Sequence, residues 1–402
     1  MRIHRRGTCA RAPARLLSAA AAGAALLTGC SSLSVPTAAD PGARQPRSPS
    51  PSWPSPSSPS PPPSPSAPPD PLATPGPGGL SLRQEVGAVM MVAFRGPATP
   101  QVLADWRAHQ YGGLLVIPDN QNGATPGQVR AVIAAVRGTM AHPLIAATDQ
   151  EGGTVCMRAS GAPCLAGARA AGVLGPGAVS LAMRQMACGL RAAGFDEDLA
   201  PVAGVWDGVH PFMADRSYGQ DPAAVSADVT AAVGAIHACG LLAAVKHFPG
   251  EATAAGDPHL ELPTVAESAA TLRARDWAAF RAAVRAGADM VMVGHMLTPA
   301  LDPANPTSMS PAVMRALRSE IGFGGVAISD DLQMGALSSR FTVPDAALRF
   351  LEDGGDMVLI AHDLPVADQA YQAILEAVLG GSYPRSQLDA SVSRVLASAR
   401  RG

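Results

Sequence analysis

The sequence predicts an α/β protein with one folded domain, a (β/α)8 TIM barrel, preceded by a signal peptide and a disordered Pro/Ser-rich linker. Two observations predict the barrel: short apolar runs alternate with longer helical segments beyond Leu80, and there are eight such runs. A third is length, because the region 80–402 suits a closed eight-fold barrel better than an open doubly wound sheet.

The first 29 residues have the pattern of a signal peptide, in which arginines precede an apolar run over 16–27. The run ends in LLTGC at Cys30, which resembles the lipobox of bacterial lipoproteins, where the Cys carries the lipid. A buried thiol is the alternative role for Cys30. Because the run is too short and too Ala-rich for a permanent span, we expect an exported protein, lipid-anchored to the outer face of the cytoplasmic membrane.

The region 30–79 is expected to be a tether that starts with the lipidated Cys30. From about Ser34 its composition is dominated by Pro, Ser and Ala, with too few apolar side chains to offset the entropy of folding. In a polyproline II conformation, at ~3.1 Å per residue, it would reach on the order of 100 Å. The folded domain 80–402 would then stand well away from a bilayer.

Composition excludes some partners and leaves the redox state of the cysteines open. The 402 residues are 47% hydrophobic and 15% charged, with a net charge of −2, so nothing predicts a nucleic-acid partner. Export permits disulfides. Cys156 and Cys164 share one expected loop, whereas Cys188 and Cys239 each precede a Gly near the end of an expected helix. Bridges within these two pairs and free buried thiols are both open.

The expected strands and helices follow in order along the chain. The strands span 89–94, 113–117, 144–148, 195–199, 242–246, 289–293, 325–329 and 356–360, and 195–199 is the weakest. Between them, Ser81 with Gln84 and Thr125 with Gln128 have the pattern of capping boxes, and Pro311 follows a capping hydroxyl as a first-turn proline. Most strands are therefore followed by a helix, as a parallel barrel requires.

Polar residues gather where the expected strands end. Barrel enzymes assemble their sites from the carboxyl ends of the strands and the loops that follow them. A single polar residue there could be a helix cap, but a group of them after apolar runs is difficult to explain by core packing. The residues at these ends are Asp149, Lys246, His247, His295, Asp330 and Asp331.

Several motifs extend this pattern and carry a family resemblance. They are DQEGG (149–153), DRSYGQDP (215–222), KHFPG with GDPH (246–259) and GFGGVAISDDLQMGAL (322–337). Together they resemble glycoside hydrolase family 3, specifically its single-domain β-N-acetylglucosaminidase branch (NagZ-like). The similarity covers roughly residues 80–400, and several motifs in the same order make chance similarity improbable.

The resemblance implies a retaining double displacement in which an aspartate attacks the anomeric carbon. The position that matches this nucleophile is Asp330. The matching acid/base is His259, supported by Asp257 on the loop after the fifth strand. An imidazole, with an ordinary pKa near ~6.5, can donate and accept a proton near neutrality without burial. Gly250 and Gly256 give this loop backbone freedom.

The resemblance also implies substrate contacts around the terminal sugar. The matching positions are Asp149, Arg216, Lys246 and His247. Arg158 is a further candidate, because the family's usual Arg after DQEGG is Thr154 here, and Arg158 is displaced by one residue beside the extra Cys156. Charge-assisted hydrogen bonds to the hydroxyls and acetamido region are expected from this set.

Two strand-end residues are expected to have structural roles. Asp331 should point away from the direction of Asp330, because successive strand residues alternate, and it should cap the next helix. His295 is expected to be a rim or structural residue rather than a direct ligand.

The chain departs from the family pattern at two more places. The family commonly has KHFPGHGD where this chain has KHFPGEAT, and APVLD where it has APVAG (200–204). The first change adds Glu251, which could alter loop closure or compete with His259 as a proton donor. The second replaces an aspartate with Gly204 and affects the expected substrate preference.

We therefore expect a β-N-acetylhexosaminidase that needs no cofactor and no metal, acts on peptidoglycan fragments, and works as a monomer. Chitooligosaccharides as the substrate and phosphate as the acceptor remain alternatives. Three other functions compete with this hexosaminidase activity: a β-glucosidase-like activity, a catalytically silent sugar-binding lipoprotein, and a two-lobed transport protein. The count of eight strands argues against the two-lobed transport protein. A metal site built from His247, Asp257, His259 and His295 is the other alternative.

Overall fold

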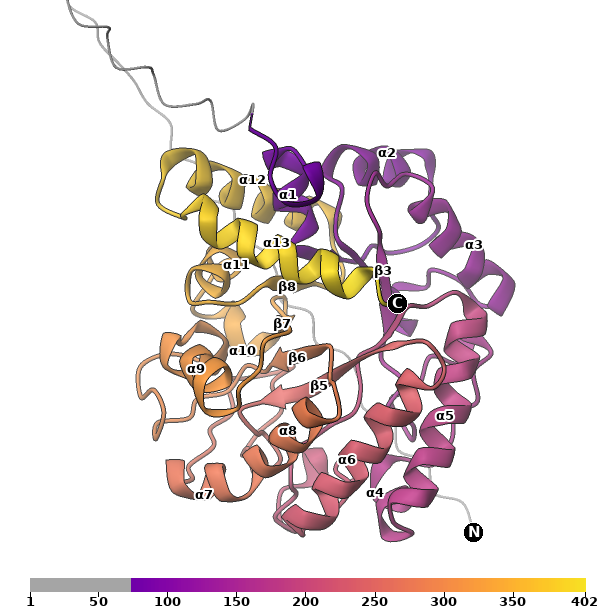
Figure 1. Cartoon of the computed structure of the whole chain (residues 1–402), viewed down its shortest axis with the longest axis vertical. Helices are drawn as coiled ribbons and strands as arrows, with labels where there is room; N and C mark the ends of the chain where they lie inside the picture. Colours follow the sequence, from indigo (N-terminus) through magenta and orange to yellow (C-terminus); the bar gives the residue numbers. More distant parts are fainter. Residues whose placement is uncertain (1–73) are drawn as a thin grey trace, which may run out of the picture. The chain divides into compact units, whose positions relative to one another are not determined.

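The computed structural model describes residues 74–402, which form a closed barrel of parallel strands in the order β1 to β8 (Figure 1). Each strand pairs with its neighbour in sequence, and β1 pairs with β8 to close the barrel. The expected TIM barrel is confirmed. The expected signal peptide, Cys30 and the tether up to residue 73 lie outside the described residues.

All eight predicted strands are present, with bounds that differ by a few residues from those expected. They are β1 (Met90–Val92), β2 (Gly113–Leu115), β3 (Ile145–Thr148), β4 (Glu197–Asp198), β5 (Leu242–Phe248), β6 (Met290–Val293), β7 (Val326–Asp331) and β8 (Met357–Ile360). The weakest apolar run gives the shortest strand, β4. Strands β5 and β7 extend beyond their apolar runs into the polar residues of the site, so that regular backbone positions those residues.

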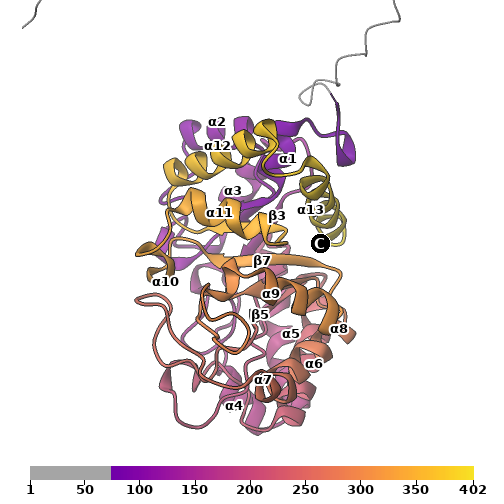
Figure 2. The same ribbon diagram turned by 90° about the vertical axis from the view of Figure 1, so that its left-hand side faces the viewer.

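Helices surround the strands, as Figures 1 and 2 show. They are α1 (Leu82–Ala88), α2 (Pro100–His109), α3 (Pro126–Arg137), α4 (Ala168–Val173), α5 (Pro176–Ala193), α6 (Pro222–His237), α7 (Ala269–Ala274), α8 (Asp276–Arg285), α9 (Pro311–Arg315), α10 (Gly335–Ser338), α11 (Val343–Glu352), α12 (Leu364–Gly380) and α13 (Arg385–Ala399). Short helical turns are η1 (Pro77–Gly79), η2 (Pro118–Asn120), η3 (Arg158–Ser160), η4 (Pro211–Met213), η5 (Thr307–Met309) and η6 (Ala316–Glu320).

The helix starts follow the capping chemistry expected from the sequence. Ser81 accepts a hydrogen bond from the backbone N–H of Gln84, whose side chain accepts one from the N–H of Ser81, and Thr125 and Gln128 repeat this arrangement. Ser310 caps α9, in which Pro311 is the first residue. These caps satisfy N–H groups that have no partner within the helix.

The core has two parts because both faces of each strand are buried. Inside the barrel, a cluster of apolar side chains fills the space between opposite strands; it includes Met91, Leu115, Ile145, Met292 and Ile328. Outside the barrel, a larger cluster packs strands against helices; it includes Trp106, Phe248, Trp277 and Phe350. A helix such as α5 contributes buried residues at three- and four-residue spacing, namely Val179, Met183, Met186, Ala187 and Leu190.

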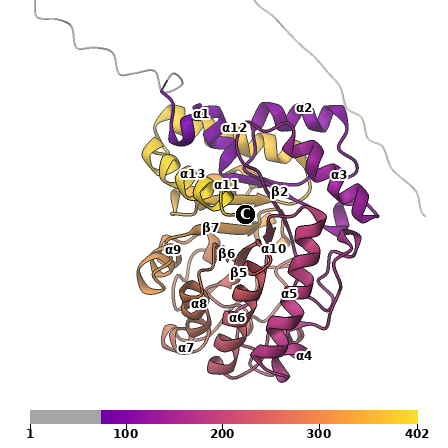
Figure 3. The ribbon, with the colours of Figure 1, turned by 45° about the vertical axis from the view of Figure 1, so that its right-hand side comes forward.

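Two disulfides link the two cysteine pairs for which the sequence left bridges and free thiols both open. Cys156–Cys164 closes a segment of the loop after β3, and Cys188–Cys239 joins α5 to the residues just after α6. Helices α4, α5 and α6 lie side by side in Figure 3, so the second bridge ties together neighbours that also pack. Within residues 74–402, no helix combines the length and the apolar character needed to cross a membrane.

The two bridges should differ in their contribution to stability. Cys188–Cys239 spans 51 residues and Cys156–Cys164 spans 8. The chain-entropy relation gives about 4 kcal/mol for the longer loop and about 2.5 kcal/mol for the shorter one. Urea unfolding of the two double Cys→Ala variants under oxidising conditions should therefore show the larger loss for the 188/239 pair. A larger loss for the 156/164 pair would contradict this expectation.

Candidate active site

A cavity of about 210 Å³ opens at the carboxyl ends of the barrel strands. It is lined by residues that follow β2, β3 and β8, among them Asp119, Asp149 and His362, and by residues in the last part of β5 and β7, among them His247 and Asp330. Pockets for drug-sized ligands are typically ~300–1,000 Å³, so this cavity suits one small polar ring rather than a chain of them. The site therefore lies where barrel enzymes place their chemistry.

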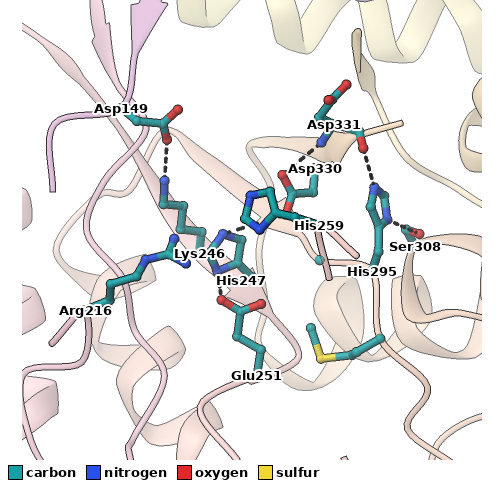
Figure 4. A network of polar contacts seen from close by, with 12 residues as sticks. Asp149, Arg216, Lys246, His247, Glu251, His259, His295, Ser308, Asp330 and Asp331 are labelled. Carbon is teal, nitrogen blue, oxygen red and sulfur yellow. Dashed lines mark hydrogen bonds and ion pairs between the residues drawn. The ribbon is translucent and has the colours of Figure 1, made fainter. Parts of the chain in front are cut away.

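One wall of the cavity is a buried network of charges centred on Lys246 (Figure 4). The Lys246 side chain is 2% exposed, and its Nζ lies 2.5 Å from Oδ1 of Asp149 and 2.8 Å from Oε1 of Glu151. Arg216 donates from Nε and Nη2 to the two oxygens of Glu151, at 2.8 Å each. Three of the predicted site residues are thus brought together, with Glu151 as the link.

The charges in this network support each other. Burial alone would raise the pKa of Glu151, but the charges and hydrogen bonds of Arg216 and Lys246 bring it well below its usual value. Burial would lower the pKa of Lys246, but Asp149 and Glu151 raise it. Glu151, Lys246 and Arg216 are therefore charged over a wide pH range. Glu151 was not among the predicted site residues, and its place in DQEGG was the only signal that could have identified it.

Asp330 faces the cavity from the end of β7. Its Oδ1 accepts a hydrogen bond from the backbone N–H of Asp331 at 2.8 Å, and its Oδ2 lies 3.8 Å from Nε2 of His247. Burial by itself raises the pKa of Asp330, but the charge of His247, followed by that of His295, holds it below the usual value. This carboxylate is ionised and partly desolvated, as a nucleophile requires.

Asp331 differs from the sequence expectation in its capping role. Its side chain points away from that of Asp330 in Figure 4, as expected, although both residues line the cavity and β7 has an irregular register between Ile328 and Asp331. It does not cap α10, whose N-cap is Met334. Instead its Oδ1 accepts hydrogen bonds from the N–H groups of Gln333 and Ala361, which joins β7 to the end of β8.

Burial raises the pKa of Asp331 to about 7, and the neighbouring Asp330 adds to this rise. The two adjacent carboxyl groups therefore differ in protonation near neutrality, with Asp330 ionised and Asp331 partly protonated. His295 is structural, as expected. Its two ring nitrogens contact Oγ of Ser308 and the carbonyl of Asp331, and it holds the end of β7 in place (Figure 4).

His259 reaches the cavity from the loop after β5. Its Nδ1 lies 2.7 Å from Oδ1 of Asp257, and its side chain is 60% exposed. The N–H groups of Gly335 and Ala336, at the start of α10, donate to the carbonyls of His259 and Pro258 at 3.1 and 3.0 Å. The loop is thus held next to Asp330 by two backbone hydrogen bonds.

Glu251 and Gly204, two positions at which this chain departs from the family pattern, lie close together in the structure. The carboxylate of Glu251 contacts Nδ1 of His247, and both side chains are buried. A Cβ added at Gly204 would lie 2.9 Å from Cβ of Ala252, the residue after Glu251. A side chain at position 204 would therefore press on the segment that carries Glu251.

Arg158 lies apart from the other predicted residues. It is on η3 and lines a separate hollow with Pro97, Gln121 and Gln128 rather than the cavity of Asp330. The side chains of His247, His259 and His295 have different partners, and in residues 74–402 no three His, Cys, Asp or Glu side chains are arranged to hold a metal ion. The proposed metal site therefore has no support in this part of the chain.

Comparison with known proteins identifies similar sequences. Residues 81–398 match the family model described as glycosyl hydrolase family 3 N terminal domain. A protein named beta-hexosaminidase from Stenotrophomonas maltophilia is 34% identical over 314 residues, covering 74% of this chain and 91% of that relative. One of the same name from Xanthomonas campestris is 33% identical, covering 72% of this chain and 88% of the relative.

Solved structures are similar over the whole barrel. A family 3 β-N-acetylglucosaminidase from a Paenibacillus species has a TM-score of 0.75 and 33% identity, over 80% of this chain. This chain spans 62% of that protein, which is less than two thirds of its length. A glycosyl hydrolase of family 3 from Mycobacterium smegmatis has a TM-score of 0.72 and 31% identity, over 79% of this chain and 97% of its own.

Gly335 allows the loop of His259 to dock. A Cβ at this position would lie 2.5 Å from the carbonyl oxygen of His259 and 2.7 Å from that of Leu260, both backbone atoms that cannot rotate away. Gly335→Ala should displace His259 and, because a misplacement of 1 Å can cost ~10²-fold, lower kcat/KM on an aryl β-N-acetylglucosaminide by about 10- to 100-fold. Gly324→Ala, whose Cβ meets nothing within 4 Å, is the matched control. Equal activity of the two variants would contradict this role.

Asp331 should make the stability of the protein depend on pH. Its pKa of about 7 in the folded state lies above the value of 3.8 expected in the unfolded chain, so the folded state binds more protons between these values. Its contribution to stability therefore falls as pH rises from about 4 to about 7. Asp331→Asn does not titrate, so urea unfolding should show this variant gaining stability relative to the parent over that range. A constant difference across the range would contradict the assignment.

Proposed function

The chain belongs to glycosyl hydrolase family 3, and we propose that it removes non-reducing terminal β-linked N-acetylglucosamine by a retaining double displacement. The relatives named beta-hexosaminidase and the similar β-N-acetylglucosaminidase structure support this substrate. The single observation that carries the proposal is an ionised Asp330 and a His259–Asp257 pair in one sugar-sized cavity.

In the proposed first step, Oδ2 of Asp330 attacks the anomeric carbon and the bond to the leaving oxygen breaks. His259, in its imidazolium form, gives a proton to that oxygen. In the second step, neutral His259 takes a proton from water, which attacks the glycosyl-enzyme and releases Asp330 as a carboxylate. The acid/base is thereby returned to its protonated form.

Asp257 orients the acid/base in this proposal. Although partial burial raises the pKa of Asp257, the N–H and ring of His259 hold it below the usual value. Because its carboxylate occupies Nδ1 of His259, Nε2 is left to face the leaving oxygen. The exposed side of His259 leaves room for an aglycone outside the cavity.

The charged wall of the cavity would hold the sugar. Asp149 and Lys246 present fixed polar atoms to hydroxyl groups, and Arg216 and His247 complete the contacts expected around the ring and its acetamido group. Arg158 is proposed only as a residue of the outer substrate path, because it lies in a separate hollow. Family members share these motifs, so the roles rest on similarity together with the placement of the side chains.

We also propose that the natural substrates are peptidoglycan fragments, with chitooligosaccharides as the second candidate. The support for this is the LLTGC pattern at Cys30 and the Pro/Ser-rich stretch after it, which suit an exported monomer lipid-anchored outside the cytoplasmic membrane. Neither a cofactor nor a metal enters the proposed steps. Phosphate in place of water as the acceptor stays an alternative of the same site.

Substitution of the two proposed catalytic residues tests this function. On an aryl β-N-acetylglucosaminide, Asp330→Ala should abolish turnover because no glycosyl-enzyme can form. His259→Ala should lose about 10²- to 10⁴-fold on a disaccharide and less on an aryl glycoside, because a good leaving group needs little protonation. Both rates are measured by steady-state kinetics on folded protein.

The same assay separates the alternatives. Turnover of the matching aryl β-glucoside alone would show a β-glucosidase. Saturable binding of N-acetylglucosamine without turnover would show a silent sugar-binding protein, and near-normal activity of Asp330→Ala would reject the nucleophile. Loss of activity on chelation would restore the metal alternative.

A further inference from the structure

Glu251 is a buried acidic residue at a position where the family pattern has histidine. Its side chain is 3% exposed, and its carboxylate contacts Nδ1 of His247 (Figure 4). A buried carboxylate is costly unless it is paired, so this contact ties Glu251 to the ring of His247.

His247 lies between two carboxylates. On the other side of its ring, Nε2 lies 3.8 Å from Oδ2 of Asp330. The ring of His247 therefore bridges the Glu251 carboxylate and the carboxylate that performs the attack.

The other charged groups near His247 agree with this arrangement. His295 approaches from the end of β6; burial lowers its own pKa, and it acts on Asp330 after His247. Lys246, the preceding residue on β5, is paired with Asp149 and Glu151. Arg216 faces Glu251 and is paired with Glu151. Of these groups, His247 does most to hold the pKa of Asp330 below its usual value.

We propose that Glu251 is a positioning residue that holds the ring of His247 in place beside the carboxylate of the nucleophile Asp330. This inference rests on the proposed function. It assigns Glu251 no direct contact with the reacting atoms. It also explains how a glutamate can replace the family's histidine here without leaving an unpaired charge.

The contacts oppose the other role that the sequence allowed for Glu251, that of proton donor. A proton donor must reach the leaving oxygen, but the Glu251 carboxylate is buried and committed to His247. His259 is far more exposed and lies at the outer part of the cavity, where an aglycone would leave. The two roles predict different kinetics, because an acid catalyst matters most for poor leaving groups.

The decisive experiment is the pH profile of kcat/KM for Glu251→Gln, with an aryl β-N-acetylglucosaminide and with chitobiose. Loss of the contact with Glu251 frees the ring of His247 from its place beside Asp330, so the pKa of Asp330 rises and the acid limb of the profile should move to higher pH. At neutral pH we expect a loss of about 10- to 100-fold that is similar for both substrates. Glu261→Gln, an exposed carboxylate on the same loop, is the matched control and should behave like the parent.

A double-mutant cycle with His247→Ala adds a second readout. If Glu251 acts through His247, the double variant should lose little more than His247→Ala alone. Glu251→His, the residue in the family pattern, keeps a ring in place without the charge, so it should fold and still show the shifted acid limb.

Three outcomes would overturn the inference. An unchanged acid limb in both Glu251 variants would show that Glu251 does not influence Asp330. Additive losses with His247→Ala would show that it does not act through His247. A loss confined to chitobiose would make Glu251 the acid/base itself. Failure of the proposed function is distinguishable, because Asp330→Ala would then keep its activity.

Discussion

The buried pairing of Lys246 with Asp149 and Glu151 is the interaction on which the site depends. A lysine that is almost fully buried must be compensated, and two carboxylates from the loop after β3 supply that compensation. Arg216 then neutralises Glu151 from a different segment, after β4. Removing Glu151 would take away the carboxylate that Arg216 and Lys246 share. The network therefore joins three parts of the barrel mouth as well as lining the cavity.

Carboxylates in this barrel have different protonation states because their surroundings differ. Asp330 and Asp331 are consecutive, yet cationic neighbours keep one ionised while burial and its neighbour's charge raise the pKa of the other. On β4, Glu197 is fully buried without a cationic partner, and burial with nearby carboxylates raises its pKa well above the usual value. The residue type alone therefore does not identify a nucleophile, and the partners across the barrel do.

The sequence predicts the features that depend on a local pattern of residues, and it does not predict the contacts between residues that are distant along the chain. The eight strands, the capping boxes and the rim residues follow from periodicity, turn chemistry and motifs read along the chain. The contact between Glu251 and His247, the place of Arg158 and the role of Glu151 could not be predicted in this way. Each depends on how loops fold back, and a one-residue irregularity in β7 was enough to place Asp331 in the cavity.

The nucleophile and the acid/base are held in opposite ways, and their chemistry explains why. Asp330 lies on a strand among buried charges, because attack on the anomeric carbon requires an ionised and fixed carboxylate. His259 lies on a loop held against α10 by two backbone hydrogen bonds, and an imidazole titrates near neutrality without burial. A loop held in this way can open to release the product and then close again. A carboxylic acid in the same role would need burial to raise its pKa, and it would lose that burial each time the loop opened.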